Sequence, residues 1–142
     1  MTIGLVSCVK TKLKVPAKAK DLYISSLFKK SRRWAECNCD EWFVLSAQYG
    51  LVDPEQSAKP YELTMKSFPI ADRKRWARKV YKTMDNVGLL KPDSKFIWLA
   101  GLDYSHELSL LLSGYPQHHP LKGLRMGKRL KWLGKQLEHC EV

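Results

Sequence analysis

Three short apolar runs, separated by amphipathic stretches, dominate the pattern of hydrophobic and polar positions. The runs cover residues 2–7, 41–46 and 95–100. Each is apolar along its length rather than alternating, which is typical of strands buried on both faces. The stretches between and after them repeat their apolar residues at helical spacing. They predict helices over residues 22–37, 71–84, 105–113 and 122–137, the first with Asp21 as its N-cap.

The order of these elements predicts a single α/β domain over residues 1–142. Strands that alternate with helices form a mostly parallel sheet with right-handed crossovers and helices on both faces. We therefore expect a three-layer, Rossmann-like fold whose sheet has three to four strands. In such sheets a ligand binds beyond the carboxyl ends of the strands.

Positive charge is the strongest signal in the composition. The chain has 25 lysines and arginines against 14 aspartates and glutamates, a net charge of +11 at pH 7. This excess favours DNA, RNA or a nucleotide-like small molecule as partner, and the alternative is a basic surface that binds nothing. The residues expected on a nucleic-acid-binding surface are Arg73, Lys74, Arg78, Lys122, Arg125 and Lys128.

The same sequence argues against several other classes of protein. No apolar run can cross a bilayer, and the first residues lack the pattern of a signal peptide, so we expect a cytoplasmic protein without membrane association. Cys37 and Cys39 are too close together for a zinc knuckle, and the glycine motifs of phosphate and dinucleotide sites are missing. We expect reduced thiols, no metal and no cofactor.

Polar side chains gather where each predicted strand ends. Because the carboxyl ends of parallel strands meet at one edge of a sheet, these clusters are expected to converge. Gly50, just after the second cluster, is expected to have a positive φ or to let a ligand approach the backbone. The clusters are Ser7, Cys8, Lys10 and Lys12, then Ser46, Gln48 and Tyr49, and finally Gly101, Asp103, Tyr104 and His106.

The first cluster has the most reactive composition. A thiol beside lysines has its thiolate favoured, so Cys8 is a candidate nucleophile. The favoured alternative is that Cys8 packs as a small hydrophobe while Lys10 or Lys12 binds phosphate or carboxylate. A lysine with a depressed pKa can itself be the nucleophile, and Lys12 is the candidate for that role. Ser7 is assigned to substrate binding.

The other two clusters suggest base recognition and proton transfer. Tyr49 and Tyr61 can stack on a base and Gln48 can read its edge, whereas the alternative is a loop held by buried tyrosines. His106 is a candidate general acid or base with Asp103 as its orienting partner. The alternative is that both residues cap or pack the following helix.

Three stretches together resemble a family of uncharacterised bacterial and phage domains. The resemblance covers nearly the whole chain, and its motifs include Tyr23, which joins the substrate-binding candidates. The stretches are Ser7-Cys8-x-Lys10-x-Lys12 with Asp21-Leu22-Tyr23-x-Ser25, Leu45-Ser46-Ala47-x-Tyr49-Gly50-Leu51 with Pro60-Tyr61-x-x-Thr64, and Pro120-Leu121-x-Gly123-Leu124-x-x-Gly127.

Two further resemblances imply a function. Residues 49–65 are similar to the Tyr-Gly-Leu-Leu and Pro-Tyr-Arg-Leu-Glu-Met segments of YaaA-type peroxide-stress proteins, which bind DNA. Cys8-x₃-Lys12 resembles an element of archaeosine synthases, whose lysine takes part in chemistry on a modified tRNA base. In those enzymes Pro-Tyr follows the lysine, whereas Leu13-Lys14 follow it here. Both resemblances imply an α/β core like that of uracil-DNA glycosylases.

The leading hypothesis is a nucleic-acid-binding or nucleobase-processing protein. A glycosidic-bond hydrolase or a base-modifying transferase is the natural enzyme class for it. One alternative is a non-catalytic DNA- or RNA-binding module that needs only the charge. Another is a protein that binds an acidic protein. Whether a reaction is catalysed stays open at this point, as does the oligomeric state.

Overall fold

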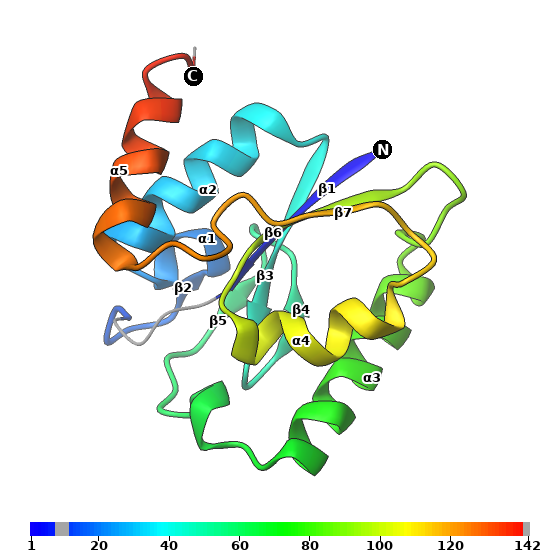
Figure 1. The fold of residues 1–142 in the computed structure, drawn as a ribbon. Helices are drawn as coiled ribbons and strands as arrows, with labels where there is room; N and C mark the ends of the chain where they lie inside the picture. Colours follow the sequence, from blue (N-terminus) through cyan, green and yellow to red (C-terminus); the bar gives the residue numbers. More distant parts are fainter. Residues whose placement is uncertain (8–11, 141–142) are drawn as a thin grey trace.

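A five-stranded sheet forms the centre of the molecule, for which the computed structural model describes residues 1–7 and 12–140 (Figure 1). The strands lie in the order β4-β3-β1-β6-β7, and β4 alone of these is antiparallel to its neighbour. The prediction of a mostly parallel sheet is therefore confirmed. The bounds are β1 Thr2–Ser7, β3 Glu41–Ser46, β4 Gly50–Val52, β6 Lys95–Leu99 and β7 Gln117–His118.

The sheet is wider than the three to four strands expected, because β4 and β7 are too short to form an apolar run. A separate two-stranded antiparallel sheet pairs β2, Ala17–Lys18, with β5, Ser57–Ala58. Both of its strands lie in segments that the sequence predicts as loops. Gly50, at the start of β4, has φ +75°, as its position in the turn predicts.

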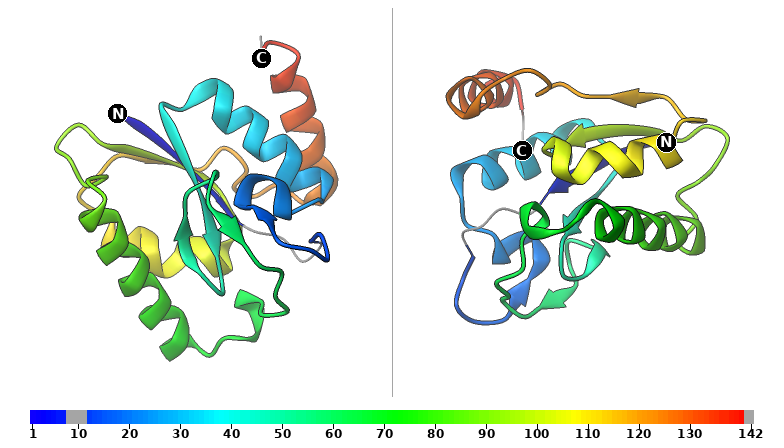
Figure 2. Two further views of the ribbon diagram at one scale, coloured as in Figure 1. Left: turned by 180° about the vertical axis from the view of Figure 1, so that it is seen from behind. Right: turned by 60° about the horizontal axis from the view of Figure 1, so that its bottom comes forward.

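Helices cover both faces of the sheet and complete the three layers (Figure 2). α2 and α5 pack together on one face, whereas α3 and α4 pack together on the other. No helix of the described residues has both the length and the apolar character required to cross a membrane. The bounds are α1 Ala19–Leu22, α2 Ser26–Asn38, α3 Ile70–Asn86, α4 Leu102–Leu111 and α5 Met126–Leu137, with a 3₁₀ turn, η1, at Met65–Ser67.

The N-cap predicted at Asp21 is wrong, because the expected helix is two helices separated at Tyr23. Tyr23 has extended backbone angles and pairs with Lys12 in an antiparallel bridge, which interrupts the helix. Ser25 caps α2 instead, and its Oγ accepts a hydrogen bond from the Phe28 N–H at 3.1 Å. The Asp21 carboxylate forms an ion pair with Arg32 at 3.0 Å.

Two helix starts also differ from the sequence-based expectation. α4 begins directly after β6, at Leu102 rather than at residue 105. α5 begins at Met126 rather than at residue 122, because Gly123 has φ +80°, a left-handed conformation that ends helical geometry there. Asp103 and Tyr104 therefore lie in the first turn of α4, whereas Lys122 and Arg125 precede α5.

Strand β1 is the middle strand of the sheet, and its side chains are the centre of the core. Ile3 and Leu5 are fully buried. Gly4 lets α2 approach the sheet closely, since a Cβ at this position would lie 3.0 Å from Cys39 Sγ and 3.2 Å from Ala35 Cβ. This tight packing fixes the direction in which β1 delivers the residues that follow it.

The cysteines do not all match the expectation of reduced thiols. Cys37 and Cys140 form a disulfide that joins the end of α2 to the segment after α5, with their Cα atoms 6.1 Å apart. The expectation is wrong for this pair, because a sequence separation of 103 residues gives no local signal. Cys39 is a free thiol, and its burial and the neighbouring Asp40 raise its pKa to about 11.

Cys39 should therefore resist alkylation in the folded protein. At pH 8 a thiol with a pKa of about 11 is thiolate in only about one molecule in a thousand, and the thiolate is the reacting species. Peptide mapping after iodoacetamide treatment at pH 8 should find Cys39 unmodified in the native protein and modified in urea. Rapid modification of the native thiol would contradict the packing described for Gly4 and Cys39.

Candidate functional site

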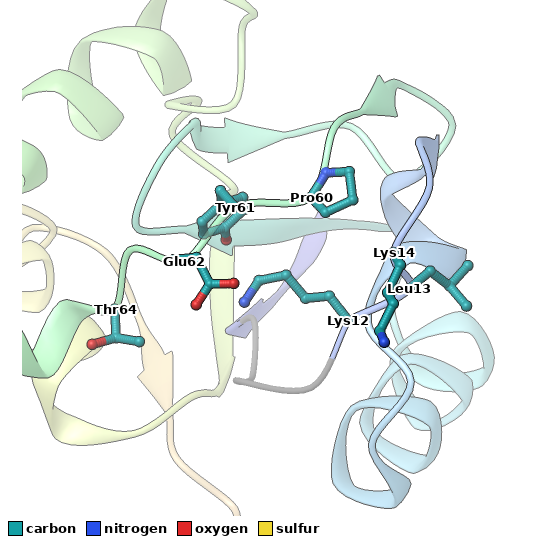
Figure 3. Close-up of a pocket in the computed structure, with 7 residues that line it drawn as sticks. All are labelled: Lys12, Leu13, Lys14, Pro60, Tyr61, Glu62 and Thr64. Carbon is teal, nitrogen blue, oxygen red and sulfur yellow. The ribbon is translucent and has the colours of Figure 1, made fainter.

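A pocket of about 410 Å³ opens between the segment that follows β1 and the segment that follows β5 (Figure 3). This volume lies within the ordinary range for small-molecule sites, roughly 300–1,000 Å³. Its wall combines an aromatic ring, two lysines and a carboxylate. The lining residues are Lys12, Leu13, Lys14, Pro60, Tyr61, Glu62 and Thr64.

Tyr61 is the residue through which the pocket is tied to the rest of the fold. Its hydroxyl accepts a hydrogen bond from Ser46 Oγ at 2.7 Å and shares another with the Tyr23 hydroxyl at 2.8 Å. Its ring meets the Tyr49 ring edge to face, with centroids 5.3 Å apart. These contacts from three separate segments hold the Tyr61 ring in one orientation.

Ser46 lies beneath Tyr61 at the end of β3 and is fully buried. Its Oγ also accepts a hydrogen bond from the Tyr49 N–H at 3.0 Å, and its carbonyl accepts one from Trp76 Nε1 at 2.9 Å. Trp76 belongs to α3, so this contact connects the sheet, the turn before β4 and a covering helix. Ser46 therefore supports the pocket wall from behind and does not face a ligand.

Lys12 is placed by backbone pairing and held against aromatic rings. It pairs with Tyr23, and the Leu13 N–H donates to the Leu22 carbonyl at 2.8 Å. Its Nζ lies 4.6 Å from the centroid of the Tyr61 ring and 6.0 Å from that of Tyr23, within the range of a cation–π contact. Tyr23 is 2% exposed, so it too supports the wall from behind.

Glu62 is a member of the pocket that the sequence analysis does not identify. Its carboxylate and the Lys12 amine point toward one another across the pocket (Figure 3). Glu62 lies in an extended segment with no periodic pattern, and the signal available for it was its place directly after the Pro60-Tyr61 motif. Lys14 and Thr64 line the same pocket. Thr64 belongs to the Pro60-Tyr61-x-x-Thr64 motif, but the sequence assigns no role to either residue.

The loop between β3 and β4 reaches the pocket through a single side chain. The Tyr49 hydroxyl donates to the Lys59 carbonyl at 2.9 Å, and Tyr49 is 36% exposed beside Tyr61. Gln48 is exposed and does not line the pocket. Of the residues expected to read a base, Tyr61 thus lines the pocket and Tyr49 borders it.

The predicted cluster after β6 does not join Lys12. Tyr104 is buried and packs edge to face on Trp76 at 5.7 Å. His106 is exposed on α4, and neither it nor Asp103 lines the Lys12 pocket. Gly101 is the residue before α4 and lies with Ser7 on a different, smaller pocket. α4 begins directly after β6, which directs these side chains to the α3 face of the sheet. Proton transfer by His106 and Asp103 stays a prediction.

Cys8 and Lys10 lie outside the described residues, so their assigned roles also stay predictions. Within residues 1–7 and 12–140 no three histidine, cysteine, aspartate or glutamate side chains gather as a set of metal ligands.

The basic residues form two separate surfaces, because their helices cover opposite faces of the sheet. Lys74 and Arg78 are exposed on α3, and Arg73 is partly buried with its Nε donating to the Phe68 carbonyl at 3.2 Å. Lys122, Arg125 and Lys128 are exposed at the start of α5 or just before it. A single flat contact with nucleic acid cannot use both surfaces at once.

Comparison with known proteins places the chain in a family without an assigned activity. Residues 3–135 match a family of unknown function (DUF6884). The match spans nearly the whole chain, so the protein belongs to this family. No curated protein matches the sequence.

Proposed function

We propose that this protein binds nucleic acid and takes one nucleotide into the Lys12 pocket, where it acts on the base or on its glycosidic bond. The observation that carries the proposal is Lys12 Nζ, 4.6 Å from the centre of the Tyr61 ring on the wall of a pocket of about 410 Å³. A lysine can hold a phosphate while an aromatic ring stacks on a base. Lys12 and Tyr61 lie close enough together to contact the phosphate and the base of one nucleotide.

The charge of the whole chain supports the same partner. A net charge of +11 attracts a polyanion and supplies affinity through counterion release. Exposed basic residues on α3 and around the start of α5 extend beyond the pocket. In this proposal one of these two surfaces holds the phosphate backbone, while one nucleotide enters the pocket.

The presence of Lys12 and Glu62 on the wall of one pocket supports a reaction at the glycosidic bond. A carboxylate stabilises the positive charge that develops on the sugar when this bond breaks, and it can also accept a proton from an attacking water. Water then supplies hydroxide to the sugar carbon, and its proton goes to the leaving base. Lys12 would hold the phosphate or donate a proton to that base. Glu62 replaces His106 as the acid–base candidate, because it lines the same pocket as Lys12.

A non-catalytic nucleic-acid-binding module is the second candidate. The observation that favours it is the exposure of Lys74 and Arg78 on α3, outside the pocket. Such a protein would lose binding when these two residues are neutralised and would be indifferent to changes at Lys12.

The test compares two lysines of equal charge. Lys12→Ala should weaken binding of nucleoside 5′-monophosphates about tenfold or more, since a hydrogen bond to a charged group contributes roughly 1.5–3 kcal/mol. Lys91→Ala is the control, because Lys91 is exposed in the turn that precedes β6 and does not line the pocket. Calorimetric titration of both variants measures the difference.

Each outcome decides a part of the proposal. Equal affinities for Lys12→Ala and Lys91→Ala would show that the pocket is not the nucleotide site. Oligonucleotide binding that survives Lys12→Ala and fails in a Lys74→Ala, Arg78→Ala double variant would favour the non-catalytic module. Release of free base from oligonucleotides, followed by liquid chromatography, should stop in Glu62→Gln. No release by the wild-type protein would overturn the catalytic part.

A further inference from the structure

A second recess lies between the carboxyl ends of β1 and β6, and it shares no lining residue with the Lys12 pocket. It consists of two adjoining pockets of about 60 Å³ and about 20 Å³, which have Ala100, Leu121 and Arg129 in common. Ser105 also lines the larger pocket, and Ser31 lines the smaller one.

The topology of the sheet creates this recess. The chain passes from β1 to α2 on one face, whereas it passes from β6 to α4 on the other (Figure 2). β1 and β6 are neighbours, so the two connections diverge and leave a crevice at their carboxyl ends. In open parallel sheets this reversal point is where ligands bind.

Two serines on the walls of the recess have unsatisfied hydroxyl groups. Ser31 and Ser105 are each 2% exposed, and no hydrogen bond joins either hydroxyl to a described residue. In the described part of the chain, Trp34 Nε1 is the one fully buried side-chain nitrogen or oxygen without a hydrogen-bond partner. Because the Ser31 and Ser105 hydroxyls also have no partner, their oxygens must retain some contact with solvent. The hydroxyls therefore reach the surface of the recess, where they can donate to a ligand.

Arg129 gives the recess its charge. Its Nε donates to the Leu124 carbonyl at 2.7 Å, which anchors the guanidinium, and no carboxylate of residues 1–7 and 12–140 forms an ion pair with it. Lys122 adds a second positive charge to the wall. An anchored guanidinium with free N–H groups is suited to a planar or tetrahedral oxyanion.

The N-terminus of α4 opens on the same recess. α4 has ten residues, and Gly101 at its N-cap gives no side-chain hydrogen bond to the first N–H groups. Gly101 and Leu102 line the recess, whereas the Asp103 carboxylate lies against Gly101 and does not. First-turn N–H groups without partners favour an anion.

The size of the recess restricts the ligand to a small group. A single water needs roughly 10–15 Å³ of such space, so about 60 Å³ accommodates a few water-sized atoms and excludes a nucleobase. His119 stacks flat on Trp98 at 5.8 Å on the same wall. Burial and then the charge of Lys122 lower the pKa of His119, so its ring is neutral at pH 7 and can still donate a hydrogen bond.

We propose that the recess between β1 and β6 binds a phosphate group, held by the Arg129 guanidinium, the Ser31 and Ser105 hydroxyls and the first N–H groups of α4. The site goes beyond the proposed function, because none of its residues lines the Lys12 pocket. It also explains why Ser31 and Ser105 are serines. A buried hydroxyl without a partner lowers the stability of the fold, and alanine at either position would avoid this penalty.

The first experiment measures the melting temperature in sodium phosphate and in sodium chloride of equal ionic strength. Phosphate should raise the melting temperature of the wild-type protein, because a ligand that binds the folded state stabilises it. Arg129→Ala should lower the phosphate affinity tenfold to a hundredfold. Arg33→Ala is the matched control, because Arg33 is exposed on α2 and lines neither pocket.

Ser105→Ala separates a ligand site from a structural role. Removing a buried hydroxyl without a partner should leave the melting temperature in chloride unchanged or raise it, while phosphate affinity falls about tenfold. Phosphate should also raise the pKa of His119, which NMR of the imidazole resonances reports. Unchanged phosphate affinity in both Arg129→Ala and Ser105→Ala, or no phosphate effect on the wild-type protein, would overturn the proposal.

Titrations with inorganic phosphate and with a nucleoside 5′-monophosphate show whether the recess binds free phosphate or the phosphate of a nucleotide. If Arg129→Ala weakens both and Lys12→Ala weakens neither, the recess is a phosphate site independent of the nucleotide pocket. If both variants weaken the monophosphate and only Arg129→Ala weakens inorganic phosphate, one nucleotide bridges the two sites. If Lys12→Ala alone weakens either ligand, the recess proposal fails and the proposed function stands.

Discussion

Trp76→Ala is expected to destabilise the protein by about 3–5 kcal/mol, the usual cost of removing a large aromatic side chain from a core. Trp76 is 7% exposed, packs edge to face on Tyr104 and donates its indole N–H to the Ser46 carbonyl. Its loss leaves a cavity between α3 and the sheet and a buried carbonyl without its partner. Urea unfolding followed by far-UV circular dichroism measures the change in the free energy of unfolding.

Two control variants divide this effect into its causes. Trp76→Phe keeps an aromatic ring and removes the hydrogen bond, so about 1–3 kcal/mol should be lost. Ile70→Ala removes an exposed side chain from the same helix and should stay within about 0.5 kcal/mol of wild type. A Trp76→Ala protein as stable as Ile70→Ala would show that α3 does not pack on the sheet as described.

Trp76 also shows what the sequence could and could not predict. The spacing of Trp76, Val80 and Met84 predicts a buried helical stripe, and all three are buried in α3. The hydrogen bond from Trp76 to Ser46 joins residues 30 positions apart, and no local pattern signals it. Periodicity specifies which face of a helix is buried, whereas the partner of that face depends on the topology of the sheet.

The elements that the sequence missed are short or lack periodicity. β1, β3 and β6 are apolar runs of five or six residues and are predicted to within one residue. β2, β5 and β7 have two residues each, so no alternation can be detected in them. The break at Tyr23 depends on pairing with Lys12, an interaction between segments that propensity does not describe.

The candidate site divides in the same way. The sequence identifies Ser46 by its place at the end of a strand and Tyr61 by the Pro60-Tyr61 motif. The two residues are hydrogen-bonded in the structure. Glu62 and Arg129 are missed, since one lies in an extended loop and the other is one of many basic residues near α5. What distinguishes Arg129 is its anchoring at Leu124 beside unsatisfied serines, which only the folded structure reveals.

Tyr61→Ala is expected to reduce nucleotide affinity about 5- to 150-fold, since stacking of a base on an aromatic side chain contributes roughly 1–3 kcal/mol. The substitution removes the ring beside Lys12 Nζ and the hydroxyl that bonds to Ser46 and Tyr23. It should therefore lower the stability of the fold as well. Loss of affinity alone would not show whether the ring touches the ligand or only supports the pocket.

Tyr61→Phe distinguishes these two roles. It keeps the ring beside Lys12 and deprives the buried hydroxyls of Ser46 and Tyr23 of a partner, so stability should fall by about 1–3 kcal/mol. If the Tyr61 ring stacks on the base, nucleotide affinity stays near wild type in Tyr61→Phe and falls in Tyr61→Ala. If affinity follows stability through both variants, Tyr61 only positions the wall. A larger loss in Tyr49→Ala than in Tyr61→Ala would then identify the exposed Tyr49 ring as the stacking surface.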